Sequence, residues 1–290
     1  SRYINSHIAY DEKIDNNRTL TKCYVSPGNL LKFYDVIKKY GEVKLYKSKS
    51  RKIDIVIKDY YDNTTRQTIY VKRRDAKEGE IINQTFQKYL KYDEPADIRL
   101  GSCRFYFPKY SFDRNTFLSY NEAVEQDLIS FSLNDGATAI FNYPVVSIPV
   151  PSAFDSTLLS KAVLIQNGKN SYGGHIENDS LRVRITKLGD FAVSVDTIPP
   201  TIEVGSFLAN AVGKPYFRFA IYDNYSSAGF ATDIKYEVFI DGQWIAAPLK
   251  ALTNTLIVPL EDITSGLHTI KIKVTDMVGN SKVWEREFNN

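Results

Sequence analysis

A twelve-residue segment that occurs twice constrains the fold of this chain more than any other feature. Residues 53–64 read IDIVIKDYYDNT, and residues 270–281, which lie 217 positions later, read IKIKVTDMVGNS. In both copies alternating apolar residues lead into an aspartate, which is followed by turn-forming residues. Such alternation is typical of a strand with one buried face. We therefore predict the same β-hairpin at two places, and hence a chain built from tandem β modules.

The turn chemistry of the two copies supports a hairpin. Asp59 and Asp276 are expected to close the turn through their side chains, with left-handed backbone at Asn63 and Gly279. A second strand is expected after each turn, over residues 67–72 and 283–288. We interpret this hairpin as the last one of a small β-sandwich.

The amino-acid composition also favours strands. The chain of 290 residues has 20 tyrosines and 16 phenylalanines but one methionine, and 43% of its residues are hydrophobic. Aromatic residues are enriched in strands, and this apolar fraction supports packed cores. No apolar run has the length of a membrane span. The predicted fold class is all-β, with two or three immunoglobulin-like or β-sandwich modules in tandem, the first of them incomplete.

Composition and turn signals divide the chain into three predicted modules. Residues 1–75 form a partial immunoglobulin-like module, because a complete one takes about 100 residues. Residues 76–197 form a middle β-sandwich, and residues 198–290 form a terminal immunoglobulin-like sandwich. The boundary is placed at Asp196-Thr197-Ile198-Pro199-Pro200, since two prolines stop strand pairing.

Further expectations concern single elements. In the first module, the spacing of apolar residues over 30–40 predicts a helix. In the terminal module, Asp241-Gly242 predicts a tight hairpin turn, with Trp244 partly buried beside it. Cys23 and Cys103 are 80 residues apart. A disulfide between them and two unpaired thiols both remain open.

The charge is distributed unevenly. Residues 1–74 hold 17 lysines and arginines against 8 aspartates and glutamates, a net charge of +9, whereas the remainder has a net charge of −6. A basic patch in the first module is a candidate site for an anionic glycan or protein partner, with Tyr34, Tyr40 and Tyr46 available for stacking. The alternative is an edge strand that lysines protect from aggregation. No nucleic-acid-binding motif is present. The patch comprises Lys38, Lys39, Lys44, Lys47, Lys49, Arg51, Lys52, Lys72, Arg73 and Arg74.

Residues that bear catalytic or metal chemistry are sparse. The three histidines, His7, His175 and His268, are each more than 90 residues apart, which does not fit the tight spacing of a zinc site. The carboxylate pairs Asp11-Glu12 and Glu261-Asp262 are adjacent and are read as solvated charges. We expect no catalytic, cofactor or metal residue. Calcium is the alternative, at Asp223 with Asn224 or at Asp276 with Asn280, because such oxygen donors at module ends can hold it.

An ordered set of motifs carries a resemblance to a known family. These are the opening Arg2-Tyr3-Ile4-Asn5-Ser6, the segment Cys23–Asn29, the turn Asp59–Thr64, the stretch from Gly173-Gly174-His175 to Gly189-Asp190-Phe191, and the segments Asp196–Ile202, Asp241–Trp244 and Gly266–Ser281. The set resembles the modules that follow the catalytic domain in large lysostaphin-type (LytM-like) zinc endopeptidases of the Gram-negative envelope. The zinc-binding histidine and aspartate motifs of that family, with its His-x-His pair, are missing here, so the resemblance implies a catalytic domain before residue 1 or none.

These observations lead to a functional hypothesis and two alternatives. The first is a non-catalytic accessory or scaffold region of a peptidoglycan endopeptidase-like protein, which positions a catalytic domain or docks on an envelope protein. The resemblance places it in the bacterial periplasm or at the outer membrane. The second is a free-standing adhesion or carbohydrate-binding protein. The third is a zinc metalloendopeptidase whose catalytic domain lies upstream, so the sequence leaves open whether the whole protein is an enzyme.

Overall fold

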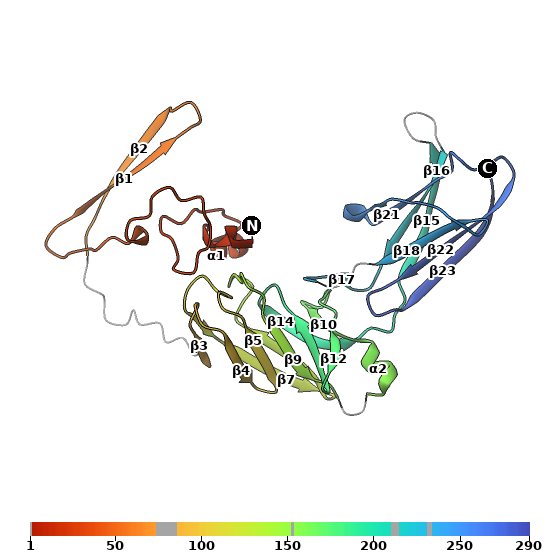
Figure 1. Cartoon of the computed structure of the whole chain (residues 1–290), viewed down its shortest axis with the longest axis horizontal. Helices are drawn as coiled ribbons and strands as arrows, with labels where there is room; N and C mark the ends of the chain where they lie inside the picture. The colour runs from red at the N-terminus through yellow and green to blue at the C-terminus, as the bar shows by residue number, and fades with distance from the viewer. Residues whose placement is uncertain (1, 74–85, 152–153, 210–214, 231–233) are drawn as a thin grey trace.

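The chain folds into β-sheets that form three successive parts of the molecule (Figure 1). The computed structural model describes residues 2–73, 86–151, 154–209, 215–230 and 234–290. Strands dominate throughout, which confirms the predicted all-β class. None of the helices in these ranges has the length and hydropathy that a membrane span requires.

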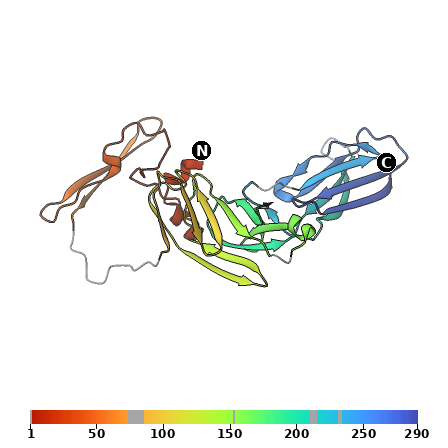
Figure 2. The same cartoon turned by 60° about the horizontal axis from the view of Figure 1, so that its bottom comes forward.

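The N-terminal part contains one hairpin and few other regular elements. The hairpin, β1 with β2, forms a two-stranded sheet by itself and projects away from the rest of the molecule (Figures 1 and 2). A single isolated bridge joins Ile8 and Thr21. The elements are η1 (Arg2–Ser6), α1 (Tyr10–Asp15), η2 (Lys39–Gly41), β1 (Arg51–Lys58) and β2 (Thr64–Val71).

The helix predicted over residues 30–40 is wrong. This segment is irregular until η2, where Lys39 and Tyr40 have positive φ angles. Its apolar side chains remain exposed, for example Val36 at 75% and Phe33 at 50%. Most helices in proteins depend on packing of an apolar face. In the described residues most apolar side chains of this segment stay exposed, so the periodicity alone does not form a helix.

The middle part is a sandwich of two sheets. One sheet has the strand order β17-β11-β10-β14-β8-β7 and the other has the order β12-β13-β9-β5-β4. Burial alternates along β5 and β8, so their inward side chains, such as Phe105 and Phe131, meet in one core. The elements are β3 (Lys88–Leu90), β4 (Ala96–Leu100), β5 (Cys103–Phe107), β6 (Thr116–Leu118), β7 (Tyr120–Glu125), β8 (Leu128–Leu133), β9 (Val145–Pro149), α2 (Ser156–Ser160), β10 (Ala162–Gln166), β11 (Asn170–Ser171), β12 (His175–Glu177), β13 (Ser180–Arg184) and β14 (Gly189–Val195).

The terminal part is a second sandwich with its own core. Its sheets have the orders β15-β16-β21-β20 and β19-β18-β22-β23, and they enclose residues such as Phe219, Leu256 and Ile272. The elements are β15 (Thr201–Ala209), β16 (Pro215–Tyr222), β17 (Ser226–Ser227), β18 (Lys235–Ile240), β19 (Gln243–Trp244), β20 (Leu249–Lys250), η3 (Ala251–Thr253), β21 (Thr255–Pro259), β22 (Leu267–Thr275) and β23 (Ser281–Asn289).

The sequence repeat is also a structural repeat. β1 pairs with β2 from Arg51↔Val71 to Lys58↔Thr64, and the positions 217 residues later, His268↔Phe288 to Thr275↔Ser281, pair in the same register in β22 and β23. One residue of slip would send every side chain to the opposite face. The shared register therefore shows that the two hairpins present equivalent faces.

The two turns repeat the same hydrogen bonds. Oδ1 of Asp59 accepts from the backbone N–H of Tyr61 (2.8 Å) and of Asn63 (2.9 Å), and Asn63 Nδ2 donates to Oδ2. Asp276 accepts the same set of bonds from Val278 and Asn280. The predicted role of both aspartates is confirmed. The positive φ in the first copy, however, belongs to Asp62 rather than Asn63, and its counterpart is Gly279.

Two further expectations have different outcomes. Asp241 and Gly242 both have positive φ and connect β18 to β19, as the tight turn predicted. Trp244 is 64% exposed, so its predicted partial burial is wrong, and Trp284 instead contacts Phe219 edge-on in the core. Trp244 lies on β19, a two-residue strand at the edge of its sheet. Cys23 is exposed, Cys103 is buried, and both are free thiols.

Candidate functional site

The middle and terminal sandwiches share one sheet. β17 belongs to the connection between β16 and β18, yet it pairs in parallel with β11 of the middle sandwich, Asn170 opposite Ser226 and Ser171 opposite Ser227. The backbone N–H of Ser226 donates to Lys169, and that of Ala228 donates to Ser171. The two sandwiches are therefore joined by a ladder of backbone hydrogen bonds in addition to the covalent linker at residues 197–200.

The turn between β22 and β23 completes this joint. Lys161 Nζ donates to the carbonyl of Val278 at 2.7 Å, and Asn280 Nδ2 donates to the carbonyl of Asp196 at 2.9 Å. The turn that is exposed in the first hairpin is therefore inserted between two sandwiches in its second copy. The same turn structure thus occurs once on the exposed surface and once between two sandwiches.

Three aspartates meet at this joint. Asp196 follows β14, Asp223 follows β16, and Asp276 follows β22, and each offers a carboxylate oxygen within 4.8 Å of the others. Each strand ends at the same place in the joint, which explains why residues far apart in the chain converge. Asp196 and Asp276 are buried, at 1% and 4% exposure, and Asp223 is partly buried.

Neutral amides orient the carboxylates. Asn224 Nδ2 donates to Asp196 Oδ1 at 3.2 Å, and Asn280 Nδ2 donates to Asp276 Oδ2 at 2.7 Å. Oδ2 of Asp196 and Oδ1 of Asp223 are buried and have no hydrogen-bond partner. A buried oxygen without a donor costs about 1–3 kcal/mol or more if charged. The protein thus supplies hydrogen bonds to some oxygens of the cluster and leaves two buried carboxylate oxygens without a donor.

The same environment raises the pKa of two of the three aspartates. Burial, reinforced by the charges of Asp196 and Asp276, raises the pKa of Asp223 to about 6. Burial, with repulsion from Asp276, also raises the pKa of Asp196. A raised carboxyl pKa means that the fold is favoured below the unfolded value near 4 and loses that advantage as pH rises through the folded value. Ionised Asp223 is therefore destabilising at neutral pH.

The sequence located this site only in part. It offered Asp223 with Asn224, or Asp276 with Asn280, as alternative oxygen-donor pairs, and the structure brings both pairs into one cluster. It missed Asp196, which it treated only as part of the module boundary. Its available signal was an acidic residue placed directly after a strand and before a stiff Ile-Pro-Pro linker.

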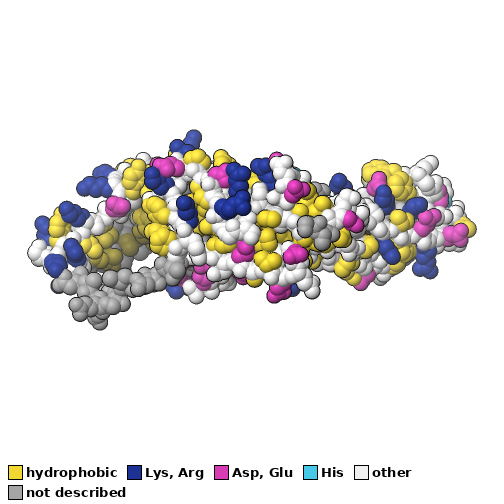
Figure 3. Space-filling model, turned by 90° about the horizontal axis from the view of Figure 1, so that it is seen from below, with side chains coloured by type: hydrophobic (Ala, Val, Ile, Leu, Met, Phe, Trp, Pro, Cys, Tyr) yellow, Lys and Arg dark blue, Asp and Glu magenta, His cyan; other side chains and the backbone are white. Residues whose placement is uncertain are grey.

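The basic patch is only partly assembled. Nζ of Lys44, Nζ of Lys49 and Cζ of Arg51 lie 5.7, 5.6 and 5.2 Å from the ring centroid of Tyr46. Lys52 instead forms an ion pair with Asp54 at 3.0 Å. Lys38 and Lys39 belong to the segment around η2, Lys47, Lys72 and Arg73 flank the hairpin, and Arg74 lies outside the described residues. Figure 3 shows several dark-blue side chains at the hairpin end.

The tyrosines proposed for stacking are engaged or isolated. The ring of Tyr46 already makes cation–π contacts with basic side chains of this chain. Tyr34 contacts the rings of His7 and Phe33, and its hydroxyl accepts a hydrogen bond from Asn29 Nδ2. Tyr40 is 56% exposed. No ring contact joins these three tyrosines in the described residues, and the positively charged cluster around Tyr46 is the part of the predicted patch whose contacts are defined.

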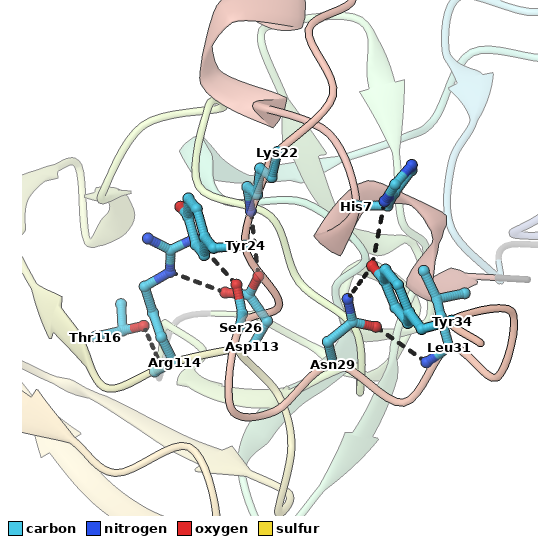
Figure 4. Close-up of polar contacts among 10 residues, drawn as sticks. All are labelled: His7, Lys22, Tyr24, Ser26, Asn29, Leu31, Tyr34, Asp113, Arg114 and Thr116. Atoms are coloured by element: carbon cyan, nitrogen blue, oxygen red, sulfur yellow. Dashed lines mark hydrogen bonds and ion pairs between the residues drawn. The ribbon is translucent and has the colours of Figure 1, made fainter. Parts of the chain in front are cut away.

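The segment Cys23–Asn29 attaches the N-terminal part to the middle sandwich (Figure 4). Lys22 Nζ lies 3.3 Å from Asp113 Oδ2, and Arg114 binds the other carboxylate oxygen of Asp113 at 3.1 Å. The backbone N–H of Gly28 donates to the carbonyl of Asp113 at 2.7 Å. A Cβ at Gly28 would lie 2.9 Å from the Tyr92 ring, so the close approach requires glycine. The Pro-Gly-Asn motif is thus a docking segment.

The histidines lie in separate environments. His7 contacts Tyr34, His175 Nε2 lies 3.5 Å from Glu177, and His268 bonds Asp241. No pair of them shares a neighbour in these contacts. The adjacent carboxylates Asp11-Glu12 and Glu261-Asp262 are exposed or partly exposed.

We predict that His268 stays protonated to a higher pH than an ordinary histidine. Its Nδ1 faces Asp241 at 2.6 Å and its Nε2 faces the carbonyl of Thr264 at 2.8 Å; the bond to Asp241 and then the bond to Thr264 raise its pKa. The resulting stability is complete below the unfolded pKa near 6.5 and is lost as pH rises through the raised value. NMR titration should show a lower His268 pKa in Asp241→Asn. That variant keeps an acceptor for Thr269, so an unchanged pKa would contradict the assignment.

Comparison with known proteins gives one family match. Residues 87–196 match the family described as the Zu5-like domain. No curated protein matches the chain. The matched range coincides with the middle sandwich and ends at Asp196, the first of the three clustered aspartates.

Proposed function

We propose that this chain is a non-catalytic scaffold region of a peptidoglycan endopeptidase-like protein of the bacterial envelope, which positions a catalytic domain or docks on an envelope protein. The ordered motifs that resemble envelope endopeptidases support the family assignment. The shared sheet between the two sandwiches supports a positioning role, because a joint with paired strands fixes the direction of one module relative to the other. Periplasm and outer-membrane surface are both compatible with this role.

The observation that carries the proposal is the unfinished hairpin. β22 pairs with β23 on one edge and with β18 on the other, whereas β1 pairs only with β2 in the described residues. Ile272 and Val274 are fully buried, but their counterparts Ile55 and Ile57 are 40% and 65% exposed. The same hairpin thus lacks the strand and the opposite sheet that cover it in the terminal module.

The missing cover is a strand from the preceding part of the protein or from a partner chain. An open strand edge pairs with an extended segment through backbone hydrogen bonds, and alternate side chains of that segment fill the apolar face. β18 shows the geometry, since it runs antiparallel to β22 over Lys235↔Thr275 to Ile240↔Ile270. A two-stranded hairpin is marginally stable in water, so docking stabilises it as well as binding the partner.

We predict that the hairpin amides exchange much faster than their structural copies. In the chain alone, hydrogen exchange over residues 51–71 should outpace exchange over residues 268–288, because only the second hairpin lies within a packed sandwich. Fusion to the preceding segment of the natural protein should then protect residues 51–58. Equal protection of both hairpins in the isolated chain would refute the docking role.

A second function is favoured by the cations around Tyr46. Lys44, Lys49 and Arg51 concentrate positive charge on one ring, which suits an anionic glycan or an acidic protein surface. Sedimentation with purified peptidoglycan distinguishes the two functions. Saturable binding that is lost in the K44A/K49A/R51A variant favours carbohydrate binding, and zinc-dependent release of muropeptides by this chain would overturn the scaffold proposal.

A further inference from the structure

We infer that Asp196, Asp223 and Asp276 form a calcium site that locks the middle and terminal sandwiches together. The inference does not depend on the docking role of the hairpin, since it concerns the opposite end of the middle sandwich. Each sandwich contributes: Asp196 directly follows the last strand of the middle one, and the other two aspartates come from the terminal one.

The spacing and chemistry of the donors fit calcium. Calcium takes six to eight oxygen ligands at about 2.3–2.6 Å, so ligand oxygens around one ion lie up to about 5 Å apart. The three carboxylate oxygens lie within 4.8 Å of one another. Hard carboxylate donors without histidine or cysteine disfavour zinc, and the irregular convergence of three strand ends disfavours the strict octahedral geometry of magnesium. Water molecules would complete the coordination.

The second, independent observation is the state of the inward oxygens. Asp196 is only 1% exposed, and its Oδ2 has no hydrogen-bond partner. Oδ1 of Asp223 is also buried and unpartnered. Buried carboxylates are normally paired or coordinate a metal. The other oxygens of Asp196 and Asp276 accept hydrogen bonds from the amides of Asn224 and Asn280 and from backbone N–H groups, none of which brings a charge.

Among the described residues, no lysine, arginine or histidine forms an ion pair that would neutralise the cluster. The ammonium of Lys161 acts on Asp196 through its charge, but its hydrogen bond goes to the carbonyl of Val278. In the described part of the chain, none of the three aspartates takes part in an ion pair. Three acids in one buried place therefore require an external cation when they are ionised.

The first hairpin provides an internal comparison. The Asp59 side chain accepts the same three turn hydrogen bonds as that of Asp276, yet its turn is exposed, and in the described part of the chain no aspartate of another strand joins it. The hairpin turn thus forms without Asp196 and Asp223. Those two acids serve something other than the turn, and a cation shared with Asp276 gives them a role.

Calcium titration of the intact chain tests the site. After removal of metals with EGTA, isothermal titration should show one calcium bound per chain. The melting temperature should rise with calcium, because at a concentration of 100 times Kd a ligand shifts the folding equilibrium about a hundredfold. Magnesium at the same concentration should give a smaller rise. An absent calcium response, or an equal or larger magnesium response, overturns the calcium assignment.

Asp223→Asn gives the sharper test, because its effect on the melting temperature should have opposite signs in EGTA and in calcium. In EGTA the variant should melt above the wild type, since the isosteric amide removes one of three like charges and can donate to the others. With calcium it should melt below the wild type and bind calcium at least about tenfold more weakly. Asp262→Asn, at an exposed position of the same module, is the control and should match the wild type. The same order of melting in both buffers refutes the site, and Asp196→Asn repeats the test independently.

Discussion

Asp113→Ala should detach the N-terminal docking segment and cost about 3–5 kcal/mol, the usual effect of removing one partner from a buried ion pair. The side chains of Lys22 and Asp113 are only 11% and 10% exposed, so the variant leaves an ammonium buried without its partner. Arg114 loses the same carboxylate. Urea unfolding should report the lost stability, and hydrogen exchange should show faster exchange over residues 22–29.

A matched control comes from the surface of the same sandwich. Asp97 accepts two hydrogen bonds from Arg104, at 2.8 and 2.6 Å, but this pair is 45% and 62% exposed. Exposed pairs contribute about 0–1 kcal/mol, so Asp97→Ala should change stability little. Equal losses in the two alanine variants would show that the contact of Lys22 with Asp113 does not anchor the segment.

Gly229→Ala should weaken the joint between the two sandwiches by about 2–4 kcal/mol, from overpacking together with a left-handed backbone. Gly229 has a φ of +63°, and a Cβ there would lie 2.7 Å from two ring atoms of Tyr172. That ring is 5% exposed and its hydroxyl bonds Gln166 and Thr186, so it has little room to move. Calorimetry should show the transition of the terminal sandwich shifting to lower temperature.

Gly168→Ala separates the two causes. Gly168 has a similar φ of +69°, but nothing lies within 4 Å of a Cβ at that position. This variant should show only the backbone term of about 1–2 kcal/mol. If Gly229→Ala costs no more than Gly168→Ala, the contact with Tyr172 does not hold β17 against the middle sandwich.

Local pattern predicted the strands well. The strands predicted over residues 67–72 and 283–288 fall almost wholly within β2 and β23, because strand-forming residues follow the turn formers there. The repeat also predicted the turn chemistry of Asp59 and Asp276. These features depend on neighbours within a few positions, and such interactions can be deduced from a single sequence.

Features that depend on distant partners were missed. The apolar spacing of residues 30–40 resembles a helix, but its outcome depends on whether another surface covers it. Trp244 and Trp284 both lie in strand-like sequence. Only the packing of the two sheets decides that Trp284, and not Trp244, contacts the core. Asp196 becomes a candidate ligand only because it lies beside Asp223 and Asp276, which are 27 and 80 positions away in the sequence. A single sequence does not reveal contacts over such separations.

The parallel pairing of β11 with β17 has a mechanical consequence. Tension applied between the middle and terminal sandwiches is carried by backbone hydrogen bonds at Lys169 and Ser171 as well as by the covalent linker. The bond from Lys161 to Val278 and the bond from Asn280 to Asp196 share the same load. Because these bonds act alongside the linker, we expect the joint to resist separation of the two sandwiches under force more than the linker alone would.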